Sequence, residues 1–348
     1  MSAAAGRSNG SPTPARIAYL VLGMHRSGTS AVTQVLALAG ARLPQNVMAS
    51  DPHNARGYFE PWRIALLNDE RLRAAGSAWD DPFAYPFRPL AKPAERAWTG
   101  RARALFEAEY GDVTYPLLKE PRVTVLAPLW RAMLDKLDIG ARVVIPVRHP
   151  LAVAGSLARR DGFAPQKSVL LWTAYMLAAE AYSRGLPRAF VDYDRLLADW
   201  RGEVARIEAA HGAALPKMTD KAAREISAFL TPELRHNAAD AGLAGLGWCG
   251  ALAARAAAWF EAAAAGDAPG RERLDAIGAE LAERAAQMGP LVSPLTRDLD
   301  AARAELGELR RSHAHERRQA RRVKSELDAL KEEAAVAIRR LDAVLAQN

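Results

Sequence analysis

The octapeptide Gly23–Ser30, GMHRSGTS, has the residue types and the spacing of a loop that binds phosphate groups. Gly23 and Gly28 let the backbone come close to an anion, and successive N–H groups at a helix N-terminus attract negative charge. Thr29 stands where the consensus G-x-x-x-x-G-K-[ST] has the lysine that reaches the β- and γ-phosphates, which argues against a nucleoside triphosphate. An ordinary turn between a strand and a helix is the alternative. The candidate binding residues of the loop are His25, Arg26, Ser27, Gly28, Thr29 and Ser30.

A second candidate phosphate clamp lies in the stretch VVIPVRHPLAVAGSLARRDGF, residues 143–163. Arg148 ends an apolar run, Pro150 suits the first position of a helix, and Ser156 follows Arg148 by eight residues. An arginine at the edge of a sheet and a serine on the adjoining helix can together bind a phosphate. A ligand with two well-separated phosphate groups would use both clamps. As an alternative, these residues form surface salt bridges.

Alternating strand and helix patterns predict the elements that position both clamps. Short apolar segments predict parallel strands at residues 17–22, 114–118, 142–147 and 189–193. Helical patterns cover residues 30–39, 62–73, 99–110 and 150–158. This alternation indicates an α/β doubly wound domain, a central parallel sheet flanked by helices in three layers. Ligands of such a domain bind at the carboxyl ends of the strands.

Four motifs in order resemble the sulfotransferases that use 3′-phosphoadenosine 5′-phosphosulfate (PAPS). They are GMHRSGTS, LLKEPR, VIPVRHPLAVAGSL and VDYDRLLAD, within residues 17–200, with a weaker echo in LTPELRHN. In that family the first loop binds the 5′-phosphosulfate, and an Arg…Ser pair at the spacing of Arg148 and Ser156 binds the 3′-phosphate. The family's loop carries a Lys or Arg just before Ser-Gly-Thr, here Arg26, which accounts for the missing lysine. The resemblance implies a P-loop-like fold, PAPS as co-substrate, 3′,5′-ADP as product and no required metal; it also suggests Arg235 near the nucleotide or acceptor.

Sulfuryl transfer passes through a loose in-line transition state, so the protein must position the reactants and stabilise charge. Arg26 and Lys119 are the candidates for charge stabilisation, although Lys119 can instead be a salt-bridge partner at a helix entry. The acceptor hydroxyl needs a base, and a positioned base is worth about 10²–10⁴ in rate. The resemblance suggests Glu60 for this role; His53 competes because imidazole titrates nearer neutrality. The acceptor we expect is a hydroxyl of a saccharide, glycolipid or small metabolite.

Two other functions stay open on the sequence. The apolar segment that ends in Asp192 and Asp194 also fits a Walker B strand, which keeps a divergent P-loop kinase or NTPase in view. The other alternative is a non-catalytic scaffold protein in which the C-terminal coiled-coil helix is the functional part.

A heptad pattern sets the last fifty residues apart. Small or apolar residues dominate two positions that recur every seven residues, beginning at Leu299 and at Leu295, so the sequence predicts a coiled-coil helix over residues 295–346, about 75 Å long. His313 and Glu316 interrupt the pattern within a basic stretch, residues 310–324. No aromatic residues interleave with these arginines, which argues against nucleic acid. We expect the helix to form a homodimer or to dock an assembly partner.

Composition sets the remaining expectations. The 348 residues carry a formal net charge of +7, which favours anionic partners, and the single cysteine gives no sign of an oxidising compartment. Residues 1–15 lack the apolar core of a signal peptide and read as a disordered leader before an α/β domain at 16–290. The most apolar windows, such as SVLLWTAYMLAA, are too short to cross a bilayer. We therefore expect a cytoplasmic protein without a transmembrane segment.

Overall fold

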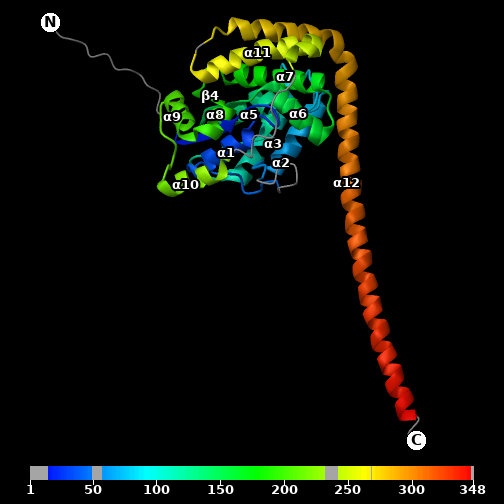
Figure 1. The fold of residues 1–348 in the computed structure, drawn as a ribbon. Coiled ribbons are helices and arrows are strands. Elements are labelled where there is room, and N and C mark those ends of the chain that lie inside the picture. The colour runs from blue at the N-terminus through cyan, green and yellow to red at the C-terminus, as the bar shows by residue number, and fades with distance from the viewer. Residues whose placement is uncertain (1–14, 49–56, 232–241, 268, 346–348) are drawn as a thin grey trace, which may run out of the picture. The chain divides into compact units, whose positions relative to one another are not determined.

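The computed structural model describes residues 15–48, 57–231, 242–267 and 269–345 (Figure 1). The chain divides into two compact units, Met1–Thr296 and Arg297–Asn348. The first unit holds the sheet and most of the helices. The second consists, where it is described, of helix only.

A parallel sheet of four strands lies at the centre of the first unit, in the order β2-β1-β3-β4. The strands are β1 (Arg16–Val21), β2 (Leu117–Leu118), β3 (Ile139–Val147) and β4 (Arg188–Asp192). Leu20 of β1 lies beside Leu118 on one side and Val143 on the other. Because helices cover both faces, the strands carry apolar residues in continuous runs rather than in alternation with polar ones.

Helices cover the two faces of this sheet and form two hydrophobic clusters. Among the described residues, the helices that lie wholly in the first unit are α1 (Thr29–Leu38), α2 (Trp62–Ala74), α3 (Lys92–Tyr110), α4 (Pro121–Val125), α5 (Ala127–Lys136), α6 (Pro150–Asp161), α7 (Pro165–Ser183), α8 (Tyr193–Ala198), α9 (Trp200–His211), α10 (Asp220–Phe229), α11 (Gly247–Ala265) and the 3₁₀ helix η2 (Leu243–Leu246). On one face, Leu20 and Ile145 pack with α5, α7 and α11. On the other, Val21 and Val144 pack with α1, α9 and α10. The predicted three-layer α/β fold is confirmed.

Several elements differ in length from the prediction: β3 and α6 are each three residues longer, and in two other cases a proline accounts for the difference. The strand predicted at 114–118 is only Leu117–Leu118, although the carbonyls of Thr114 and Pro116 still accept hydrogen bonds from β1. Pro116 has no N–H with which to continue the ladder. The helix predicted from Thr99 begins at Lys92, with Pro93 in its first turn, where a missing N–H costs nothing.

The last helix, α12, runs from Glu272 to Leu345. Pro290 and Pro294 lie inside it, in the stretch GPLVSPLT, residues 289–296. The helix is therefore longer at its N-terminal end than the heptad pattern alone predicts.

One apolar stretch among the described residues, Leu243–Ala265, is long and apolar enough to cross a membrane by length and composition, and it is longer than the windows considered in the sequence. It comprises η2 and α11. Trp259 and Phe260 of α11 make ring contacts with Phe190 of β4, and Phe260 also contacts Trp172 of α7. These contacts place α11 in the core of the first unit.

Candidate functional site

The polar residues that the sequence singled out gather where the strands end. The loop Gly23–Ser30 follows β1, Lys119 follows β2, Arg148 follows β3 and Tyr193 follows β4. Because all four strands are parallel, these residues meet at one edge of the sheet. This is the edge at which open α/β sheets bind their ligands.

The backbone conformation and the close packing at position 28, in the loop after β1, require a glycine. Gly28 precedes α1 with φ 94° and ψ 7°, and a Cβ there would lie 2.3 Å from Cδ2 of Tyr193. Thr124 accepts a hydrogen bond from the N–H of Gly23 at 2.8 Å, and the Ser27 hydroxyl donates to the carbonyl of Met24 at 2.6 Å. No side chain caps the N-terminus of α1 and no acidic residue stands in its first turn. Its N–H groups can therefore serve an anion.

Arg26 joins this loop to the second candidate clamp. Its Nε donates a hydrogen bond to Oγ of Ser156 on α6 at 2.8 Å, and its carbonyl accepts one from Nη1 of Arg148 at 2.9 Å. Arg26 has φ 69°, in the left-handed region. The guanidinium of Arg148 lies over the ring of Tyr193, 4.6 Å from its centroid. The two clamps that the sequence predicts are thus in direct contact.

Positive charge is concentrated around Arg26. Burial lowers the pKa of the Arg26 guanidinium, and the neighbouring cations Arg160 and Arg148 lower it further, while Tyr58 opposes them. An oxyanion placed among these cations would relieve their mutual repulsion. The charge pattern therefore favours an anionic ligand at this edge.

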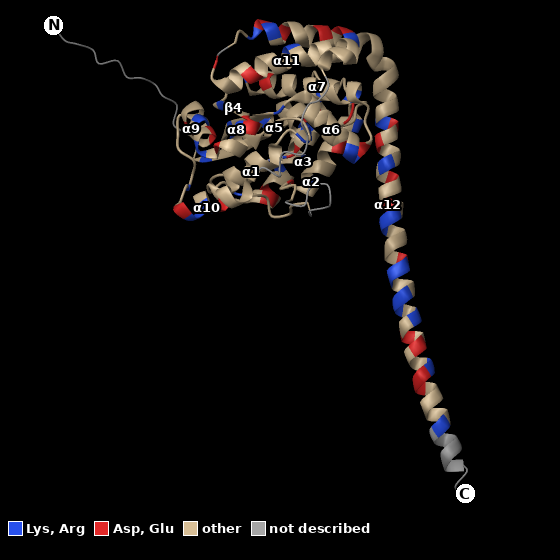
Figure 2. Ribbon diagram, viewed as in Figure 1, with Lys and Arg blue, Asp and Glu red and all other residues tan. Residues whose placement is uncertain are grey.

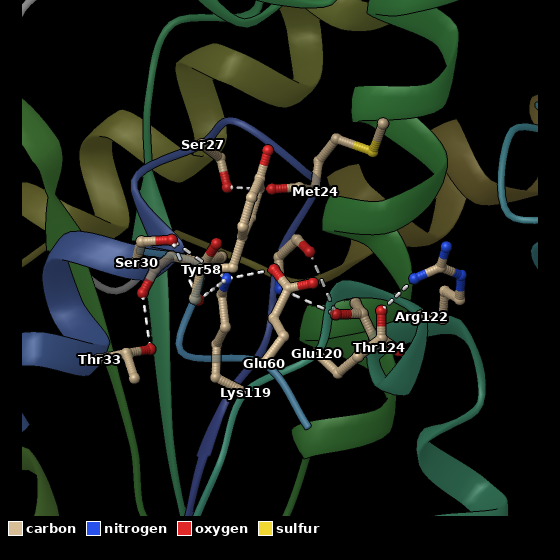
Figure 3. A network of polar contacts seen from close by, with 12 residues as sticks. Met24, Ser27, Ser30, Thr33, Tyr58, Glu60, Lys119, Glu120, Arg122 and Thr124 are labelled. Carbon is tan, nitrogen blue, oxygen red and sulfur yellow. Dashed lines mark hydrogen bonds and ion pairs between the residues drawn. The ribbon is translucent and has the colours of Figure 1, made fainter. Parts of the chain in front are cut away.

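Lys119 is the centre of a buried polar network (Figure 3). Its Nζ donates to the carbonyl of Tyr58 at 2.9 Å and to Oγ of Ser30 at 3.2 Å, and it forms an ion pair with Glu60. Lys119 is 1% and Glu60 5% exposed. The structure thus brings the candidate base, the candidate charge-stabilising lysine and a loop hydroxyl together.

Arg122 is engaged by carboxylates beside this network. It forms ion pairs with Glu120 and Asp69, and Glu120 also accepts a hydrogen bond from Asn68 at 2.7 Å. Burial raises the pKa of Glu120, against the opposing effect of Arg122. Burial alone would lower the pKa of Arg122, but Glu120 and Asp69 raise it. In these contacts Arg122 holds the carboxylates of Glu120 and Asp69.

His25 lies away from solvent, against the aromatic side chains of the core. Its ring is 4.7 Å from that of Trp79 and 6.3 Å from that of Tyr175, measured between centroids. Burial lowers the pKa of His25 well below its usual value, and the cations Arg160 and Arg122 lower it further. The imidazole is therefore neutral at physiological pH.

The remaining candidates divide between the described and the undescribed residues. Thr29 begins α1, is buried, and its carbonyl accepts a hydrogen bond from the Thr33 hydroxyl at 2.7 Å. His53 and Arg235 lie outside the described residues. Asp192, the possible Walker B carboxylate, caps α8 by accepting a hydrogen bond from the N–H of Arg195 at 2.8 Å. Within the described part of the chain no group of three or more His, Cys, Asp or Glu could hold a metal ion.

Three contacts of the site could not be recognised from any sequence motif. Thr124 binds the loop from α4, the carbonyl of Tyr58 binds Lys119, and Trp79 packs on His25. The Tyr58 contact uses a backbone atom, and Trp79 and Thr124 stand in stretches without a recognisable pattern. Only the spatial arrangement shows them.

Comparison with protein-family models gives no match, and comparison with curated proteins gives none either. Among solved structures, the chain is similar to the sulfotransferase domain of the Synechococcus PCC 7002 olefin synthase, with 16% identity and a TM-score of 0.41 over 76% of this chain and 100% of that one. It is also similar to the sulfotransferase domain from the curacin biosynthetic pathway, with 12% identity and a TM-score of 0.37 over 77% of this chain and 98% of that one.

Proposed function

We propose that this protein is a sulfotransferase that moves a sulfuryl group from PAPS to a hydroxyl and releases 3′,5′-ADP. One observation carries the proposal: Arg26 contacts both Ser156 and Arg148. The loop that would bind the 5′-phosphosulfate therefore lies beside the pair that would bind the 3′-phosphate. A single adenosine bisphosphate can contact both from one edge of the sheet.

The chain's own groups suit the donor. The N–H groups at the start of α1 and the hydroxyl of Ser30 would bind the phosphosulfate oxygens. Arg26 and Lys119 would stabilise the charge that develops on the transferred group and on the bridging oxygen, in a site where water is largely excluded. The Tyr58 carbonyl, Ser30 and Glu60 already engage all three donors of Lys119, so the lysine would exchange one of these bonds for a sulfuryl oxygen when the donor binds. In this proposal the donor needs basic side chains rather than a metal.

Ligand binding has one structural consequence. Ser156 already accepts a hydrogen bond from Arg26, so a 3′-phosphate that approaches Ser156 must share or displace that bond. The nucleotide would then release the Arg26 side chain toward the phosphosulfate. Donor binding thus orders both ends of the site.

Glu60 is the base that we propose for the acceptor hydroxyl. Its ion pair with Lys119 fixes its carboxylate beside the lysine that would stabilise the sulfuryl group. Proton removal and charge stabilisation would then occur at neighbouring positions. The acceptor class remains that of the resemblance, a hydroxyl of a saccharide, glycolipid or small metabolite, and a cytoplasmic location belongs to the same proposal.

Thermal unfolding with two nucleotides tests the proposal. A ligand at about 100 Kd adds about 2.7 kcal/mol of stability. We expect 3′,5′-ADP without Mg²⁺ to stabilise the protein and ATP with Mg²⁺ not to. The opposite pattern would support the kinase, and no effect from either nucleotide would support the scaffold. Arg103→Ala, on the exposed side of α3, serves as a control for loss of an arginine and should leave the 3′,5′-ADP effect unchanged.

A further inference from the structure

The second unit exposes a stripe of large apolar side chains along α12. With Leu299 taken as heptad position a, the a and d positions hold Leu299, Leu306, Leu309, Val323, Leu327 and Leu330, which are 47–63% exposed. A helix that carries such a stripe leaves it in water unless it packs against something else. We therefore expect this apolar stripe to pack against another helix or another protein surface.

Charges flank the stripe with opposite sign on its two sides. The e positions are basic throughout the described helix as far as residue 331: Arg303, Arg310, Arg317, Lys324 and Lys331. The charged g positions from residue 298 to residue 333 are acidic: Asp298, Glu305, Glu326 and Glu333, with Ser312 and Gln319 between them. Figure 2 shows Lys and Arg gathered over the middle of α12. One edge of the stripe is thus positive and the other is negative or neutral.

We propose that α12 pairs with α12 of a second copy of this chain as a parallel, in-register, two-stranded coiled coil. In that arrangement each g residue faces the e residue five positions later on the other helix. Asp298 then faces Arg303, and Glu305 faces Arg310, of the second copy. Glu326 likewise faces Lys331. Each such pair occurs twice in the dimer because the two helices are equivalent.

Antiparallel pairing gives the opposite result. It sets e against e and g against g, so arginines and lysines would face one another along one side of the seam, and glutamates along the other. Like charges at these positions repel. The charge pattern therefore selects the parallel orientation.

The polar residues of the seam select the register. His313 at position a and Glu316 at position d interrupt the apolar stripe. In register, each faces its own counterpart: the two Glu316 carboxylates repel one another, but no leucine packs against a polar group. A shift by one heptad would set His313 against Leu306 or Ala320. A polar residue in the seam fixes register in this way at a cost in stability.

Engineered cysteines test orientation and register. Leu309 and Leu330, both at position d, are 60% and 61% exposed in the single chain. In the full-length chain with Cys249→Ala, we expect Leu309→Cys and Leu330→Cys each to form a disulfide-linked dimer on oxidation. Ser325→Cys, at the outward-facing f position, is the matched control and should stay uncross-linked. An antiparallel pair can align at most one of the two positions with itself, so cross-linking at only one or at neither would overturn the proposal.

Charge reversal tests the pairing independently, with oligomeric state read by sedimentation velocity. The residues one turn from Arg310 on its own helix are Leu306, Gly307, His313 and Ala314. Arg310→Glu therefore acts mainly between helices and should raise the dimer dissociation constant about tenfold or more. Adding Glu305→Lys restores an attractive pair and should restore the dimer. A monomeric wild-type chain at micromolar concentration, or a failure of the double variant to recover, would contradict the proposal; the result does not depend on sulfuryl transfer.

Discussion

The close approach of Tyr193 to Gly28 predicts a specific cost for Gly28→Ala. The new methyl group would lie 2.3 Å from Cδ2 and 2.8 Å from Cε2 of the Tyr193 ring, and Gly28 has φ 94°. The left-handed backbone costs an alanine about 1–2 kcal/mol. Forcing the extra carbon into the packed ring costs about 1–3 kcal/mol more. We therefore expect the free energy of unfolding to fall by about 2–5 kcal/mol.

A matched glycine separates the two contributions. Gly185 has φ 79°, and a Cβ there would meet nothing within 4 Å, so Gly185→Ala should cost only the backbone term. Urea denaturation of both variants gives the difference directly. In a double-mutant cycle, Tyr193→Ala should recover about 1–3 kcal/mol of the Gly28→Ala loss, because the clash is gone. Equal losses for the two alanine variants, together with no coupling to Tyr193, would refute the packing of the loop against Tyr193 at the start of α8.

Three further predictions concern buried groups. Lys119→Met should destabilise the protein by about 3–5 kcal/mol, because Glu60 is left buried without its cation, and adding Glu60→Gln should recover much of that loss in urea denaturation. Glu60→Gln alone should keep 3′,5′-ADP binding but reduce turnover at least about tenfold in a sulfuryl-transfer assay; unchanged turnover would move the base to His53. Because burial holds the pKa of His25 below 6.5, the unfolded chain binds more protons under acidic conditions, and stability should fall by about 1.4 kcal/mol per pH unit below roughly 6.5. His25→Phe should flatten that slope, and an unchanged slope would show that His25 is not its source.

The sheet and the placement of the motifs could be predicted because each motif directly follows an apolar strand. Lys119 comes after β2 and Arg148 after β3, so a parallel sheet brings them to one edge whatever the loops do. The bounds of elements were harder to predict near proline, because proline can end a strand or stand in the first turn of a helix. Pro116 shortened a strand and Pro93 began a helix earlier than the periodicity suggested.

The contacts that make the site could not be predicted from the sequence. Arg26 and Ser156 are 130 positions apart, and Lys119 and Glu60 are 59 apart. Whether such side chains touch depends on rotamers and on the packing of several helices at once. For the same reason the loop motif gave no sign that the ring of His25 packs on Trp79.

Nucleotide affinity measured by calorimetry tests most directly whether one ligand bridges both clamps. The wild-type protein should bind 3′,5′-ADP at least about tenfold more tightly than 5′-AMP, because charge-assisted hydrogen bonds to Arg148 and Ser156 are worth about 1.5–3 kcal/mol. Arg148→Ala should remove that preference while 5′-AMP still binds. An equal preference in the wild type and the variant, or none in the wild type, would contradict the account.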